Sequence, residues 1–248
     1  MDRDNWVSAL AAEALGQMGD SADGAIPALV RSLRHLNSEV RRNSAEALGK
    51  LNGAAASARP SLEKSALDPD GGVRSEAIRA LGAIGAPTPT STQVVLAGLQ
   101  DVDPQVRAAA IESVGQWGET SAAVISSILR LLDDASDQVK VEVTKVIPRL
   151  AGATPDVIDG LCRRLLEDDS DWVQLYAALA LGKLGPAAAP AGASLLRAAQ
   201  TGELSVREQA MRARQSCAPY CRSLMMRTMR SRCKRSRFCP DWQAPRRR

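Results

Sequence analysis

The chain has 248 residues, of which 45% are hydrophobic but only 3% are aromatic, and its formal net charge is +4. The charge is uneven, because residues 1–210 hold 20 basic and 27 acidic side chains, whereas residues 211–248 hold 12 and 1. The sequence contains no apolar run long enough to span a membrane and no signal peptide, so we expect neither a transmembrane helix nor secretion, and a cytoplasmic location.

A pattern that begins with valine recurs along the chain at intervals of 33 or 34 residues. The valines are Val7, Val40, Val73, Val106, Val139, Val173 and Val206. Counted from each valine, apolar residues favour positions +4, +5, +7, +8 and +11, and glycine favours +9 and +12, as in Val173–Gly185. At 100° per residue the apolar positions form one face of an amphipathic helix, and the glycines are expected to end it.

A shorter apolar pattern with helical spacing lies upstream of several of these valines, for example at Ile26–Leu33 and Ile125–Leu132. Each unit is therefore predicted to contain a first helix, a short acidic turn and a second helix that begins near the valine. Neither helix can bury its apolar stripe alone, so the units must stack. The sequence predicts an all-α fold, an α-solenoid of six to seven two-helix units that forms one elongated domain over residues 1–213.

The first unit begins in its acidic turn, because Asp2–Asp4 match the residues that precede the other valines. The helix Val7–Met18 therefore has no first helix beside it in this sequence. Two interpretations remain open: the chain is a fragment of a longer array, or the uncovered helix is a surface for end-to-end self-association.

The motifs at Val40–Leu51 and Val73–Gly85 resemble HEAT repeats, most closely the short HEAT-like units named after phycobilisome (bilin) lyases. Such families place an aspartate six residues before a basic residue, and the resemblance implies a ladder of these residues between adjacent units. The matching pairs are Asp68/Arg74, Asp101/Arg107 and Asp134/Lys140. We expect the ladder to be interrupted at His35/Arg41, Asp168/Gln174 and Thr201/Arg207.

The +2, +3, +6 and +10 positions of the second helices line the inner, concave face in solenoids of the kind that this chain resembles. We expect a protein partner to bind there, through Arg42, Asn43, Glu46, Glu76, Arg79, Glu112, Glu142, Lys145, Leu175, Tyr176, Leu179 and Lys183. The charged members alternatively form a solvated face. Leu175, Tyr176, Leu179 and Val141 form an apolar patch, which the C-terminal segment alternatively covers. Trp172 either packs in a turn or joins a binding ridge.

The residues that enzymes of common classes require are missing. His35 is the only histidine, and no phosphate-binding glycine motif is present. We therefore expect no catalytic residue, no metal site and no cofactor, and a non-catalytic protein-binding scaffold. The resemblance implies one alternative, a subunit of a bilin lyase or isomerase that acts on phycobiliproteins. Within the repeats, Pro148 is expected to kink its helix or end it early.

Residues 214–248 depart from the repeat and are rich in arginine and cysteine. The cysteine spacing does not suit a zinc site, and the segment is expected to be disordered. One interpretation is a basic arm that binds nucleic acid. The other is out-of-frame translation, because a shifted reading of the possible codons across Leu224–Ser231 permits a further acidic turn and starting valine.

Overall fold

The computed structural model describes residues 24–118 and 120–217, and the predictions made for the two ends of the chain lie outside these residues. The described part is built from helices and short 3-10 segments. In chain order they are α2 (Ile26–Ser32), α3 (Ser38–Lys50), η2 (Asn52–Ala58), α4 (Arg59–Ser65), α5 (Gly71–Ala83), α6 (Pro89–Gly98), α7 (Pro104–Trp117), α8 (Ala122–Arg130), η3 (Leu131–Asp133), α9 (Asp137–Leu150), α10 (Pro155–Glu167), α11 (Asp171–Leu184), η4 (Gly185–Ala191), α12 (Gly192–Thr201) and α13 (Leu204–Ser216).

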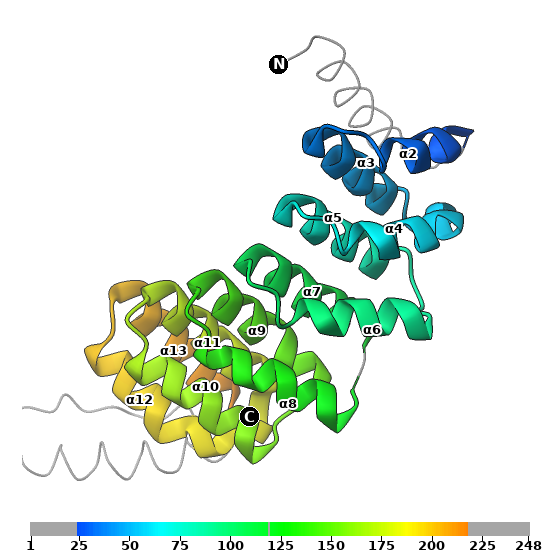
Figure 1. The fold of residues 1–248 in the computed structure, drawn as a ribbon. Coiled ribbons are helices and arrows are strands. Elements are labelled where there is room, and N and C mark those ends of the chain that lie inside the picture. The colour runs from blue at the N-terminus through cyan, green and yellow to red at the C-terminus, as the bar shows by residue number, and fades with distance from the viewer. Residues whose placement is uncertain (1–23, 119, 218–248) are drawn as a thin grey trace, which may run out of the picture.

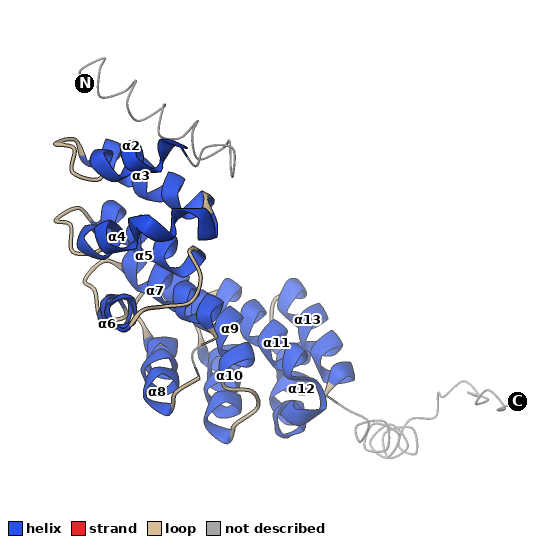
Figure 2. Cartoon of the chain, turned by 90° about the vertical axis from the view of Figure 1, so that its right-hand side faces the viewer, coloured by secondary structure: helices blue, strands red, loops and turns tan. Residues whose placement is uncertain are grey.

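Successive helix pairs stack side by side into a curved row, so the predicted all-α solenoid is confirmed (Figure 1). The even-numbered helices are the predicted first helices and the odd-numbered helices are the second. Figure 2 shows that the row bends into an arc, with the second helices along its inner side and the first helices along its outer side. The predicted repeat therefore becomes two parallel layers of helices.

The core runs between the two layers and continues from unit to unit. The starting valines Val40, Val73, Val106, Val139, Val173 and Val206 are at most 1% exposed. The residues at +8, such as Leu48 and Leu181, are equally buried. Because alanine fills many of the remaining core positions, the helices approach one another closely, as stacked repeats require.

The glycines at +9 were expected to end the second helices, but they do not. Gly49 and Gly182 lie inside α3 and α11. A Cβ atom on Gly49 would stand 3.1 Å from the Cα atom of Ala80, and one on Gly182 would stand 3.2 Å from that of Ala213. These glycines therefore permit neighbouring second helices to pack closely.

The glycines at +12 behave as predicted. Gly85, Gly118 and Gly185 follow α5, α7 and α11 and have φ values of 105°, 69° and 60°. Glycine adopts this left-handed region at little cost, so it ends the helix there.

Pro148 does not end its helix early, so this half of the prediction was wrong, while the expected kink stays a prediction. Helix α9 continues to Leu150, which is the same +11 position at which α7 and α11 end. Proline lacks one N–H group, but in the last turn of a helix this removes a single bond and leaves the preceding turns intact.

The last described helix continues past the predicted repeat boundary at Ala213. Helix α13 reaches Ser216, and Cys217 is buried at the +11 position, where its Sγ atom lies 3.5 Å from the carbonyl oxygen of Leu181. No helix in the described ranges is both long and apolar enough to cross a membrane.

Candidate functional site

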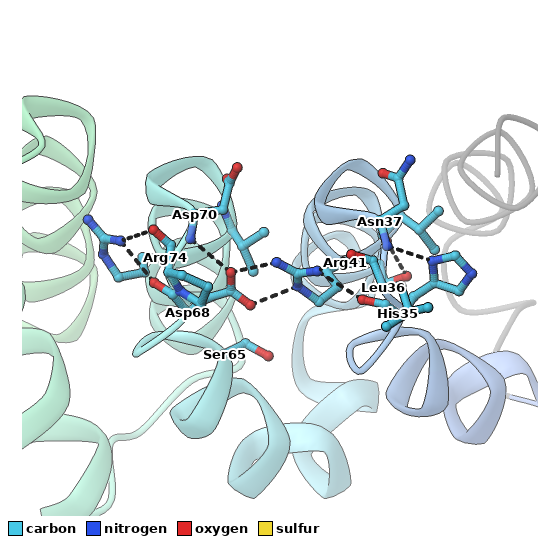
Figure 3. Close-up of polar contacts among 12 residues, drawn as sticks. His35, Leu36, Asn37, Arg41, Ser65, Asp68, Asp70 and Arg74 are labelled. Carbon is cyan, nitrogen blue, oxygen red and sulfur yellow. Dashed lines mark hydrogen bonds and ion pairs between the residues drawn. The ribbon is translucent and has the colours of Figure 1, made fainter. Parts of the chain in front are cut away.

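A ladder of ion pairs joins the turns of adjacent units (Figure 3). The Nε and Nη2 atoms of Arg41 each donate to one carboxylate oxygen of Asp68 at 2.8 Å. Arg74 holds Asp101 in the same way at 2.9 and 2.8 Å, and Arg107 holds Asp134 at 2.8 and 2.7 Å. Each basic residue therefore pairs with the aspartate of the next unit rather than with its own.

The third guanidinium nitrogen fixes each ladder arginine to its own turn. The Nη1 atom of Arg74 donates to the carbonyl oxygens of Asp68 and Pro69 at 2.9 and 3.1 Å. Because one planar group joins two consecutive turns, it sets the position of one unit against the next. The ladder is therefore a structural device.

Two of the ladder aspartates, Asp68 and Asp101, have pKa values below their ordinary range. The hydrogen bond from Arg74 is the main cause for Asp101, and it outweighs the effect of burial. For Asp68, burial favours the protonated form, but the hydrogen bonds from Arg41 and from the Asp70 backbone together lower the pKa. Both carboxylates are therefore held in their charged form.

The predicted interruption of the ladder at Arg41 is wrong, because the pairing runs forward to Asp68. The aspartate of a ladder turn also accepts a hydrogen bond from the backbone N–H two residues later. His35 replaces it in this role, since its Nδ1 atom accepts the N–H of Asn37 at 3.1 Å. In the next unit Asp68 accepts the N–H of Asp70 in the same way at 2.9 Å. The histidine thus preserves the shape of the turn.

At the other end, lysine replaces arginine and then the charge pairing stops. The Nζ atom of Lys140 donates to the two carboxylate oxygens of Asp168 at 3.0 and 2.9 Å. Gln174 donates to the carbonyl oxygen of Asp168 at 2.7 Å, and Thr201 occupies the next aspartate position. The ladder therefore ends at the point where the sequence predicted an interruption.

The predicted partner-binding residues all lie on the second helices, which form the inner side of the arc (Figure 2). From α3 to α7 ion pairs involve Glu46, Glu76, Arg79 and Glu112. The Nζ atom of Lys50 lies 2.7 Å from the Oε1 atom of Glu46. Arg79 lies 2.6 Å from Glu76 and 3.3 Å from Glu112, which belongs to the next second helix. This part of the inner face is a network of surface ion pairs, flanked by the exposed Arg42 and the half-buried Asn43.

The inner face changes character between α9 and α11, where two aromatic rings meet a lysine. The rings of Trp172 and Tyr176 are stacked with centroids 6.4 Å apart. The Nζ atom of Lys145 lies 5.3 Å from the centroid of the Tyr176 ring and 2.9 Å from a carboxylate oxygen of Glu142. We call Glu142, Lys145, Trp172 and Tyr176 the aromatic cluster.

Exposure within the aromatic cluster is concentrated on Trp172, whose side chain is 66% exposed, whereas Tyr176 is half-buried. Burial of Lys145 alone would lower its pKa, but the hydrogen bond and charge of Glu142 raise it overall. The ammonium group is therefore charged beside the Tyr176 ring. A cation and an exposed stacked ring can together receive an aromatic, guanidinium or peptide group.

The other apolar residues of the predicted patch are less exposed than the sequence suggested. Val141, Leu175 and Leu179 are half-buried, and Leu175 packs against the core. Lys183 is exposed one turn further along α11. The sequence left the position of Trp172 open, and the structure places it in α11, where the four-residue spacing to Tyr176 brings the two rings together.

In the described ranges no cluster of three or more histidine, cysteine, aspartate or glutamate residues is arranged to hold a metal ion. Cys162 is half-buried, and burial raises the pKa of its thiol, which disfavours the reactive thiolate.

The stacked helix pairs and the ladder define the class of protein as an α-solenoid built from two-helix repeats. The family model for HEAT repeats matches residues 1–82, 26–115 and 62–140. The chain therefore belongs to the HEAT-repeat family. Among curated proteins, none matches the sequence at a significant level.

Several solved structures share the fold. The complex of CpcE and CpcF of phycocyanin lyase from Nostoc sp. PCC7120 is similar with a TM-score of 0.56 and 23% identity, over 88% of this chain and 91% of that one. A designed armadillo repeat protein in complex with the peptide (KR)4 has a TM-score of 0.58 and 20% identity, over 78% and 99%. An engineered protein from a structural genomics consortium has a TM-score of 0.57 and 21% identity, over 77% and 98%.

Proposed function

We propose that this HEAT-repeat chain is a non-catalytic scaffold that binds an extended segment of a partner protein along its inner face. The observation that carries the proposal is the aromatic cluster, in which Trp172 is 66% exposed although it is stacked on Tyr176. Exposed, ordered aromatic side chains are frequent centres of protein interfaces, because they bury a large area at a small cost in conformational entropy.

The surroundings of the cluster suit an extended segment rather than a compact ligand. The neighbouring second helices present charged side chains of both signs at a regular spacing, including Glu76, Arg79 and Glu112. An extended peptide can place successive side chains against successive units of such a row. A designed solenoid of similar fold occurs in complex with the peptide (KR)4, which supports this mode of binding for the architecture.

The proposal is tested by selecting peptides from a displayed random library against the full chain. We expect enriched peptides whose affinity falls at least about tenfold in Tyr176→Ala and in Trp172→Ala, because interface aromatics contribute strongly to binding. Arg197→Ala, on the outer helix α12, is the matched control and should leave the affinity unchanged. Equal binding to all three variants would remove the aromatic cluster from the binding surface.

A second candidate follows from the likeness to the CpcE and CpcF complex, which is named as a phycocyanin lyase. In that case this chain would be a subunit of a bilin lyase or isomerase. A shift in bilin absorbance on mixing the chain with bilin, an apo-phycobiliprotein and a candidate partner subunit would support it. An unchanged spectrum with each candidate subunit would reject it and leave the scaffold proposal standing.

A further inference from the structure

Helices α12 and α13 form the last described unit, and no further described unit packs against its outward face. The residues on this face stand at the repeat positions that contact the next unit elsewhere in the solenoid. At position +5 of the second helices, the side chain is buried in every earlier described unit. Ala45, Ile78, Ile111, Thr144 and Ala178 are at most 1% exposed. Met211 stands at the same position in α13 and is 37% exposed. A core position is therefore open to solvent.

Arg207 occupies the ladder position of the last unit without a ladder aspartate. Its Nε atom donates to the carbonyl oxygen of Ala199 at 3.2 Å, and no carboxylate within residues 24–118 and 120–217 pairs with it. The side chain of Arg74, at the same position in its unit, is only 15% exposed and makes both carboxylate contacts. Arg207 is exposed instead. Its guanidinium group is available for a carboxylate from another molecule.

A shallow, open groove of about 410 Å³ lies on the same face, between α12 and α13. It is lined by Ala199, Leu204, Arg207, Glu208, Met211 and Arg212. Leu204 is 67% exposed and stands two residues before the starting valine. At the matching position in an earlier unit, a Cβ atom on Gly71 would meet the side chain of Asp103 from the next unit. This position is therefore an interface position, and the groove, which is lined by two arginines and one glutamate, suits an acidic turn.

We propose that this face binds residues 2–18 of a second copy of the chain, so that the solenoids associate head to tail. Asp2 stands five residues before Val7, the spacing at which Asp68 precedes Val73 and Asp101 precedes Val106. In this arrangement Asp2 of one copy meets Arg207 of the other, and the apolar residues of the helix that the sequence predicts over Val7–Met18 cover Met211. Helices α2 and α13 lie at opposite ends of the solenoid, so the contact joins two chains (Figure 1).

The association is weaker than the contact between units inside the chain. Gln215 occupies the +9 position of α13, where Gly49 and Gly182 permit close packing of neighbouring second helices. A side chain at this position holds the incoming helix further away. The assembly is therefore reversible and grows with protein concentration.

The test is sedimentation velocity of the full chain over a range of concentrations. The average mass of the wild type should rise with concentration. Arg207→Asp and Asp2→Arg should each weaken this association at least about tenfold, because each places like charges opposite one another. A mixture of the two variants should associate again, as chains in which the variants alternate. In one contact the introduced carboxylate faces the introduced guanidinium group, and in the next the original Arg207 faces the original Asp2.

Arg197→Asp carries the same charge change on the outer side of α12 and should associate like the wild type. Circular dichroism confirms that each variant is folded, and Arg207→Gln replaces Arg207→Asp if the latter unfolds. A wild-type chain that stays monomeric at every concentration overturns the proposal and leaves residues 218–248 or another partner as the occupant of this face. Association that survives both charge changes, or a mixture that does not recover, overturns it as well.

Discussion

The inner face from α3 to α7 and the inner face from α9 to α11 use the same repeat positions for different purposes. In the first region Arg79 pairs with Glu76 and Glu112, so the charges of these three side chains are balanced within the protein. In the second region Lys145 faces Tyr176, and Trp172 extends the stack into solvent. The helices and their register are the same, so only the side chains at a few positions separate a solvated region from a candidate binding site.

This difference separates the residues that build the solenoid from those that we propose bind a partner. The ladder and the core lie between units and fix their stacking. The aromatic cluster lies on the surface that this stacking creates. Substitutions in the two sets should therefore have opposite profiles, with large effects on unfolding in one and large effects on binding in the other.

The largest expected effect on stability comes from the core that both regions share. Leu181 and Leu48 occupy the +8 position and are fully buried. Leu181→Ala and Leu48→Ala should each lower the free energy of unfolding by about 2–5 kcal/mol, because each leaves a cavity. Urea unfolding followed by circular dichroism measures the change. A loss below about 1 kcal/mol at either site would show that it is not part of a continuous core.

The ladder should show the next largest effect. Asp101→Asn removes the charge that holds Arg74, whose guanidinium group is largely shielded from water. We expect a loss of about 1.5–3 kcal/mol, the range for hydrogen bonds to charged groups. The same urea titration measures it. A variant as stable as the wild type would mean that the ladder does not hold adjacent units together.

Acidification should act through the same carboxylates. The pKa of Asp101 in the folded chain is lowered, chiefly by the hydrogen bond from Arg74, so the unfolded chain binds protons first. Its contribution to stability is complete above the unfolded pKa of about 3.9 and is lost as the pH falls through the lower folded pKa. Unfolding free energies measured across this range should fall less steeply in Asp101→Asn than in the wild type. Equal slopes would contradict the assignment.

The sequence predicts the fold well because the same residue types recur at the same positions of successive units. The register of valine and leucine located the second helices, and the glycines at +12 marked their ends. The glycines at +9 were misinterpreted, since a helix stop and a close approach between helices favour the same residue. Only the three-dimensional packing of Gly49 against Ala80 separates the two explanations.

The candidate site was predictable in part. Tyr176 and Lys145 were placed on the inner face from their repeat positions, but their contact joins different units and depends on how these stack. Trp172 stands directly before a starting valine, so the sequence did not decide between packing in a turn and a place on a binding ridge. The structure begins α11 at Asp171, and this single boundary places the Trp172 ring over Tyr176.

The smallest expected effect on stability belongs to the ion pairs of the first region. Arg79 is about one-third exposed, and exposed ion pairs contribute little because water and salt screen them. Arg79→Ala should change the free energy of unfolding by about 0–1 kcal/mol. Urea titration beside Asp101→Asn gives a matched comparison of inner face and ladder. If Arg79→Ala lowered the free energy of unfolding as much as Asp101→Asn does, the ion pairs of the first region would also hold the solenoid together.

The affinity of a library-selected peptide for the wild type and for Tyr176→Ala tests the proposed binding function most directly. The proposal predicts a loss of at least about tenfold, while thermal unfolding shows a folded chain whose stability falls by only about 1 kcal/mol. Unchanged affinity in a folded Tyr176→Ala variant would contradict the proposal that partners bind at the aromatic cluster.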